Sequence, residues 1–154
     1  MLIFLDIDGV MVPAKSWKSP EFLDDGFPAF SPIAVRVMQK LIDTDTTVIL
    51  TTSHKAKYSI DKWKNIFAMR GLLVNNLSSL TTNSIFTKRK DEILNWFNLN
   101  QVNEDFLIID DDKSLNDLPS DLKENLLLTS PMIGLTESDV DYVKLNSQRR
   151  LHLA

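Results

Sequence analysis

Short runs of apolar and β-branched residues predict the strands of this chain. The run at residues 2–5, LIFL, shows no polar alternation, which is typical of a buried strand. Residues 75–87 are rich in Asn, Ser and Thr and are predicted to form a loop. Further strand-like runs lie at residues 46–50, 72–74, 106–109 and 126–128.

Apolar residues at helical spacing predict helices between these strands. A serine stands at the expected amino end of three helices, where its side chain can accept a hydrogen bond from a free backbone N–H: Ser31, Ser59 and Ser138. Because strands and helices alternate, we expect an α/β fold with a mainly parallel sheet. The predicted helices span residues 32–44, 60–70, 88–97 and 138–145.

Carboxylates follow two of the predicted strands. Asp6 and Asp8 leave the first strand at a turn that ends in Gly9, and the triplet Asp110, Asp111 and Asp112 follows the strand at 106–109. A single Asp-x-Asp-Gly segment is equally compatible with a solvated turn. Two such clusters at the carboxyl edge of one parallel sheet instead favour a shared site, and a hard divalent ion is the usual compensator for carboxylates held close together. The sequence therefore predicts a Mg²⁺-type site.

Hydroxyl and cationic side chains occupy comparable positions. Thr51 and Thr52 end the strand at 46–50, where hydroxyls can donate to phosphate oxygens, or can simply finish the strand and cap the next helix. Lys88, Arg89 and Lys90 lie at the amino end of a predicted helix, where the helix dipole favours anions. Because cations are unfavourable at that end of a helix, the three basic residues are interpreted as binding an anion. A solvated basic patch is the alternative.

Composition narrows the class of protein. The chain has 154 residues, 44% hydrophobic residues and a net charge of -4, so we expect one domain over residues 1–154. An acidic balance gives no general attraction to nucleic acid, so a nucleic-acid end would need a local basic patch. The absence of cysteine excludes thiol nucleophiles, zinc-thiolate sites and disulfides. No run approaches a membrane span and no signal peptide is evident, so a cytoplasmic location is expected.

Two segments fall outside the regular pattern. Residues 10–30 show no sustained period and are predicted to form an irregular excursion or small hairpin, a flap over the strand ends. Lys15, Trp17 and Lys18 lie near its tip and are interpreted as loop side chains rather than site residues. The tail, residues 147–154, is expected to be frayed or part of an interface.

The ordered set of these motifs resembles the haloacid dehalogenase (HAD) superfamily of phosphohydrolases over residues 2 to about 140. It is most similar to the small HAD domains associated with Swiss-army-knife RNA repair proteins, whose pattern is DIDGV, TSSWR, RGxEIxxWL, ILDDD and GLT. The corresponding segments are DIDGV at 6–10, TTSHK at 51–55, RKDEILNWF at 89–97, IIDDD at 108–112 and GLT at 134–136.

The resemblance implies a three-layer α/β/α Rossmann-like fold without a separate cap domain. It implies that Asp6 is the nucleophile, that Asp8 is the general acid and base, and that Thr51 orients the phosphate, with Thr52 as the alternative. Arg89 takes the family's basic position and Lys88 is the alternative. Lys90 replaces the family's Gly in this motif, which leaves the choice among the three cations open.

The same resemblance implies a Mg²⁺ cofactor held by Asp6, Asp8 and Asp111, while Asp110 and Asp112 orient the site or bind through water. The expected activity is hydrolysis of a phosphomonoester through an aspartyl-phosphate, on a bulky substrate such as a nucleic-acid end or a protein. The alternatives are a phosphatase for a small metabolite or nucleotide and a non-catalytic phosphate-binding module.

Overall fold

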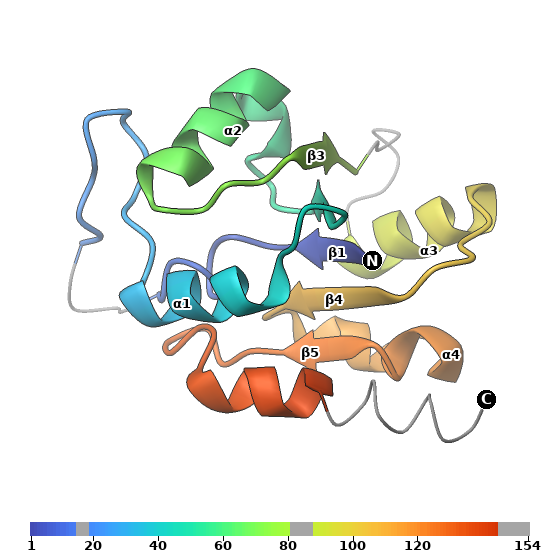
Figure 1. The fold of residues 1–154 in the computed structure, drawn as a ribbon. Helices are drawn as coiled ribbons and strands as arrows, with labels where there is room; N and C mark the ends of the chain where they lie inside the picture. The colour runs from blue at the N-terminus through green and yellow to red at the C-terminus, as the bar shows by residue number, and fades with distance from the viewer. Residues whose placement is uncertain (15–18, 81–87, 145–154) are drawn as a thin grey trace.

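A computed structural model, which describes residues 1–14, 19–80 and 88–144, shows one parallel sheet with helices on both faces (Figure 1). All strands in these ranges belong to that sheet, in the order β3-β2-β1-β4-β5. The predicted α/β class is therefore confirmed. The strands are β1 (Leu2–Leu5), β2 (Thr47–Leu50), β3 (Asn76–Ser79), β4 (Phe106–Asp110) and β5 (Leu126–Leu128).

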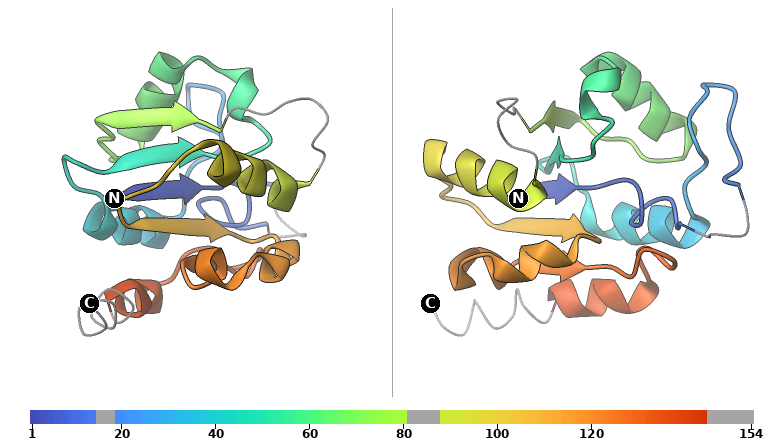
Figure 2. Two further views of the ribbon diagram at one scale, coloured as in Figure 1. Left: turned by 90° about the vertical axis from the view of Figure 1, so that its right-hand side faces the viewer. Right: turned by 180° about the vertical axis from the view of Figure 1, so that it is seen from behind.

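Each face of the sheet has its own apolar core, because successive side chains of a strand point to opposite sides. Ile3 and Leu5 of β1 face one core, and Leu2 and Phe4 face the other. The first core is covered by α1 (Pro32–Leu41), α2 (Ile60–Met69) and the helical residues 137–144. The second is covered by α3 (Arg89–Leu99), the 3₁₀ helix η2 (Lys113–Asp117) and α4 (Ser120–Lys123), which Figure 2 shows from behind. The result is the expected three-layer arrangement.

The strand register sets the edge at which side chains of the three central strands gather. Leu5 of β1 is paired with Leu50 of β2 and with Ile109 of β4. The next residues along the chain, Asp6 and Thr51, therefore leave the sheet at the level of Asp110. Order also reverses between β1 and β4, which is where open α/β sheets usually bind ligands.

The predicted strand at residues 72–74 is wrong, as is a loop beginning at 75. Leu72 and Val74 are buried but pair with no strand, whereas Leu73 is 81% exposed. The strand is instead β3, the polar segment NLSS, which pairs in parallel with β2. An edge strand is held by backbone pairing on one side, so a single buried residue, Leu77, is sufficient. The remainder of the predicted loop, residues 81–87, lies outside the described residues.

Capping explains which helix ends were predicted correctly. Ser31 Oγ accepts a hydrogen bond from the Ala34 N–H and Ser59 Oγ from the Lys62 N–H, as expected of amino caps. The last helix does not begin at Ser138, however, but at residue 137. Asp139 accepts a hydrogen bond from the Thr136 N–H at 2.7 Å, which makes Thr136 the cap.

A second correction concerns α1, which ends at Leu41 instead of near residue 44. Asp43 starts a compact turn in which it accepts hydrogen bonds from the Asp45 N–H and the Thr46 hydroxyl. This local bonding competes with helical bonding. None of the described helices has the length and apolar character needed to cross a membrane.

The described parts of the predicted flap are residues 10–14 and 19–30, and the second part includes a narrow antiparallel turn between Phe22 and Pro28. Arg70, at the end of α2, anchors this turn. Its guanidinium contacts Asp25 Oδ2 at 2.6 Å and donates to the carbonyl of Phe27 at 2.8 Å. The side chains of Arg70 and Asp25 are only 2% and 6% exposed. Lys15, Trp17, Lys18 and the tail at 147–154 lie outside the described residues.

We expect Asp25→Ala to destabilise the protein by about 3 kcal/mol, because it leaves the buried Arg70 guanidinium without its counter-charge. The measurement is urea-induced unfolding, compared with Asp24→Ala, which removes an exposed carboxylate from the neighbouring position. Equal losses of unfolding free energy in the two variants would show that the ion pair does not anchor the turn.

Candidate active site

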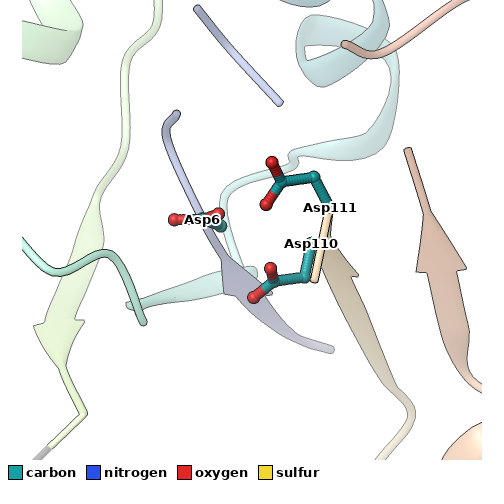
Figure 3. Close-up of side chains that lie close together, drawn as sticks. All are labelled: Asp6, Asp110 and Asp111. Atoms are coloured by element: carbon teal, nitrogen blue, oxygen red, sulfur yellow. The ribbon is translucent and has the colours of Figure 1, made fainter. Parts of the chain in front are cut away.

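Three carboxylates converge at the carboxyl edge of the sheet. Asp6, Asp110 and Asp111 each offer an oxygen, and these oxygens lie within 4.8 Å of one another (Figure 3). Asp6 and Asp110 are buried, and Asp111 is partly exposed. The structure thus brings Asp6 of the first acidic cluster together with Asp110 and Asp111 of the second.

Backbone contacts fix the two acidic turns against each other. Gly9 adopts a φ of 78°, and a Cβ at this position would overlap the carboxylate of Asp111, so no other residue fits without displacing that acid. Thr129, just after β5, donates its hydroxyl to the Gly9 carbonyl at 2.8 Å and its N–H to the Asp110 carbonyl at 2.8 Å. One threonine therefore joins both turns to the sheet.

Arg89, the first residue of α3, is the cation at this cluster. Its Nη1 lies 2.7 Å from Asp110 Oδ2 and 3.3 Å from Asp6 Oδ1. The same atom donates to Thr51 Oγ1 at 3.4 Å. Among the described residues, neither Lys88 nor Lys90 forms an ion pair with these acids. The geometry therefore favours Arg89 among the three cations that the sequence left open.

The carboxylates are held in an environment that disfavours their charge. Burial, together with the nearby Asp110, raises the pKa of Asp6 to about 8, against the lowering effect of Arg89. Burial likewise raises the pKa of Asp110, although Arg89 opposes the shift. Burial of Arg89 disfavours its own charge, but Asp110 and Asp6 raise its pKa above the usual range. For Asp6 and Asp110, the effect of burial and of mutual repulsion on the pKa therefore exceeds the opposing effect of Arg89.

The donor set fits a hard divalent cation. Carboxylate oxygens are the ligands that Mg²⁺ prefers, and Asp6, Asp110 and Asp111 supply three of them within 4.8 Å of one another. Asp110 has both oxygens engaged, Oδ2 with Arg89 and Oδ1 with the Asp112 N–H at 3.0 Å. Asp6 and Asp111 are consequently better placed than Asp110 to give an oxygen to an ion.

Asp8 lies apart from the three convergent carboxylates. Its side chain is 58% exposed, and its Oδ2 lies 2.8 Å from His54 Nε2. His54 in turn packs edge-on against Phe27 of the flap, with ring centroids 5.9 Å apart. The structure thus places Asp8 at the rim of the site rather than with the candidate metal ligands.

A cleft of about 430 Å³ adjoins the cluster, and Thr51 and Arg89 form part of its wall. Lys88 also lines this cleft. Thr52, by contrast, is fully buried, and its hydroxyl accepts a hydrogen bond from the His54 N–H. Of the predicted phosphate-binding residues, Thr51, Lys88 and Arg89 therefore line one cleft. Thr52 instead stabilises the turn that follows β2.

The sequence interpretation did not assign several residues of this region. Thr129 carried only a weak signal, a hydroxyl at the end of a strand. Lys55 and Glu92 form an ion pair of 3.2 Å in the wall of the cleft, although they are 37 residues apart. No local pattern could indicate a pair that depends on how α3 packs beside the end of β2.

Comparison with known families gives one finding. A family model described as the HAD domain in Swiss Army Knife RNA repair proteins matches residues 2–140 of the chain. Searches among curated proteins and among solved structures find no match.

The raised pKa of Asp6 predicts how the stability of the metal-free protein depends on pH. Between the usual value of 3.8 and about 8, the folded state holds a proton that the unfolded chain has lost, so stability falls as pH rises. Asp6→Asn removes this dependence. The unfolding free energy of Asp6→Asn is compared with that of the wild type at each pH. We expect the difference, variant minus wild type, to be about 3 kcal/mol larger at pH 8 than at pH 5.

The measurement is urea-induced unfolding in the presence of a chelator at both pH values. Asp117→Asn, which changes an exposed acid, is the control. An equal gain for Asp6→Asn at the two pH values would contradict the assigned environment of Asp6.

Proposed function

Because the chain belongs to the family of HAD domains found in Swiss Army Knife RNA repair proteins, we propose that it is a Mg²⁺-dependent phosphatase that hydrolyses a phosphomonoester. The family implies phosphohydrolase-type activity in general. The observation that carries the proposal is the convergence of Asp6, Asp110 and Asp111, with the guanidinium of Arg89 in contact with Asp6 and Asp110. Such an arrangement suits a reaction in which charge neutralisation and alignment supply most of the catalysis.

Asp6 acts as the nucleophile in this proposal. Its carboxylate oxygen forms a bond to phosphorus while the bond from phosphorus to the leaving oxygen breaks, which gives an aspartyl-phosphate. Arg89 supports the step because its Nη1 lies 3.3 Å from Asp6 Oδ1 and supplies positive charge next to the attacking group. When bound by Asp6 and Asp111, Mg²⁺ would neutralise further negative charge and keep Asp6 ionised.

Asp8 acts as the general acid and base. It gives a proton to the leaving oxygen and later takes one from the water that hydrolyses the aspartyl-phosphate. Its exposed position at the rim, two residues after the nucleophile, leaves it accessible to the leaving group and to water. The contact with His54 restricts its orientation before substrate binds.

Thr51 and Arg89 hold the phosphate, with Lys88 as a further cation of the cleft. Thr51 Oγ1 can donate to a phosphate oxygen without adding charge, while Arg89 and Lys88 offset the dianion. Asp110 acts indirectly, because its ion pair of 2.7 Å with Arg89 fixes the guanidinium. Each of these roles falls to a side chain at the same edge of the sheet.

Two classes of phosphomonoester are candidates. The family's description favours a phosphorylated nucleic-acid end, which is bulky and would extend beyond the cleft. The cleft volume of about 430 Å³ is near the lower end of the usual range for small-molecule sites, about 300–1,000 Å³, and favours a small phosphorylated metabolite.

We expect Asp6→Asn to lower kcat for a generic aryl phosphate by about 10³-fold or more, because the amide is not a competent nucleophile. Turnover is measured with and without Mg²⁺. Asp117→Asn should keep wild-type turnover, since it changes an exposed acid outside the site. Turnover that survives Asp6→Asn would contradict the nucleophile assignment, and wild-type protein that binds Mg²⁺ without turnover would be a non-catalytic module.

Removing the charge of Asp111 should weaken Mg²⁺ binding. Because the affinity of an oxygen site depends on its ligand charges, we expect Asp111→Asn to raise the Kd for Mg²⁺ about tenfold or more. Isothermal titration calorimetry measures this value, again with Asp117→Asn as the control. An unchanged Kd in Asp111→Asn would assign the ion to other ligands.

A further inference from the structure

The cleft beside the carboxylate cluster has an unusual wall. Within the described part of the chain, every residue that lines it has a polar side chain: Thr51, Ser53, Lys55, Lys88, Arg89, Glu92, Asp112 and Ser114. Small-molecule sites are normally lined by apolar and aromatic groups with a few polar ones among them. A leaving group that occupies this cleft therefore meets the polar ends of these side chains together with the apolar stems of its lysines and arginine.

Part of this wall is an ion pair to which the proposed reaction gives no role. Lys55 belongs to the 3₁₀ helix η1 (Lys55–Lys57), and Glu92 lies in the first turn of α3. Lys55 Nζ is 3.2 Å from Glu92 Oε2, and the two side chains are only 11% and 13% exposed. Apolar residues of similar volume often stabilise a protein as well as a largely buried ion pair does, so stability alone does not account for this pair.

The ion pair leaves hydrogen-bonding capacity on both partners. It engages one oxygen of Glu92, and Oε1 accepts no hydrogen bond from the described residues. An ammonium group has three donors, of which this contact uses one. A free donor and a free acceptor therefore lie side by side in the cleft wall.

The chemistry of the wall discriminates among leaving groups. Because Arg89 and Lys88 already offset the reacting phosphate, a second phosphate would meet Lys55 together with the carboxylates of Glu92 and Asp112, and an ammonium group would meet Lys55 and Lys88. An aromatic group would remove water from the Lys55–Glu92 pair without replacing its hydrogen bonds. A hydroxyl both donates and accepts, and it carries no charge.

We infer that the substrate of this phosphatase is the phosphate ester of a polyol or sugar, and that Lys55 and Glu92 recognise hydroxyl groups of its leaving group. The inference rests on the proposed phosphatase function and adds the substrate class. Glu92 Oε1 accepts from one hydroxyl, and the ammonium of Lys55 donates to the same or an adjacent one. Ser53 and Ser114 supply further hydroxyls in the same wall.

The test compares esters that differ only in hydroxyl groups. Glycerol phosphate and propyl phosphate share a three-carbon skeleton, and phenyl phosphate represents an aromatic leaving group. We expect the wild-type protein with Mg²⁺ to prefer glycerol phosphate over propyl phosphate by about tenfold or more in kcat/KM, because a site that bonds a hydroxyl rejects the analogue without it.

The double variant Lys55→Met/Glu92→Leu replaces the ion pair by apolar groups of similar volume and leaves no unpaired charge. We expect it to bring the ratio of the two kcat/KM values close to one. The control is Lys40→Met/Glu137→Leu, which removes an exposed ion pair of 3.1 Å between α1 and the helical residues 137–144, together with the contact of Glu137 with Arg36, and should keep the wild-type ratio. Thermal unfolding verifies that both variants fold.

Each outcome decides the inference. A wild-type ratio near one, a preference for phenyl phosphate, or an unchanged ratio in Lys55→Met/Glu92→Leu would overturn it while leaving the phosphatase proposal intact. If no ester is hydrolysed, the phosphatase proposal fails. Binding of glycerol phosphate and propyl phosphate to the wild type and both variants is then measured by calorimetry. The ratio of the two Kd values in each protein decides the inference in place of the ratio of the kcat/KM values.

Discussion

The ion pairs of Arg89 with Asp110 and Asp6 are the interaction on which the site depends. Two buried carboxylates side by side repel each other and lose hydration, and a single guanidinium at 2.7 Å and 3.3 Å compensates only part of that cost. Burial and Asp110 still raise the pKa of Asp6 to about 8. A further positive charge at this position would stabilise the ionised form of Asp6, which supports the proposed metal site.

The backbone of the sheet brings these charged side chains together. Parallel pairing of β1 with β2 and β4 places Asp6, Thr51 and Asp110 at one level of one edge, and the edge lies where the strand order reverses. Thr129 ties the turn after β1 to the end of β4, and Gly134 brings a third turn against the carbonyl of Val10. These backbone and threonine contacts fix the turns that carry the acidic side chains.

The sequence predicted those parts of the site that follow from strands and their ends. A carboxylate or hydroxyl directly after a buried strand has its place fixed by the register, which is why Asp6, Thr51 and Asp110 converge as expected. Local sequence patterns did not predict features that depend on packing between distant segments. Thus the polar edge strand β3 was mistaken for a loop, Asp8 lies with His54 instead of the cluster, and the Lys55–Glu92 pair had no sequence signal.

The central claim is that Asp6 and Asp111 hold one divalent ion beside Arg89. The most direct test is a crystal structure of the protein grown with Mn²⁺, because the anomalous scattering of Mn²⁺ locates the ion directly. We predict one strong peak within coordination distance of a carboxylate oxygen of Asp6 and of Asp111. A peak at other carboxylates, or none there at saturating Mn²⁺, would contradict the account.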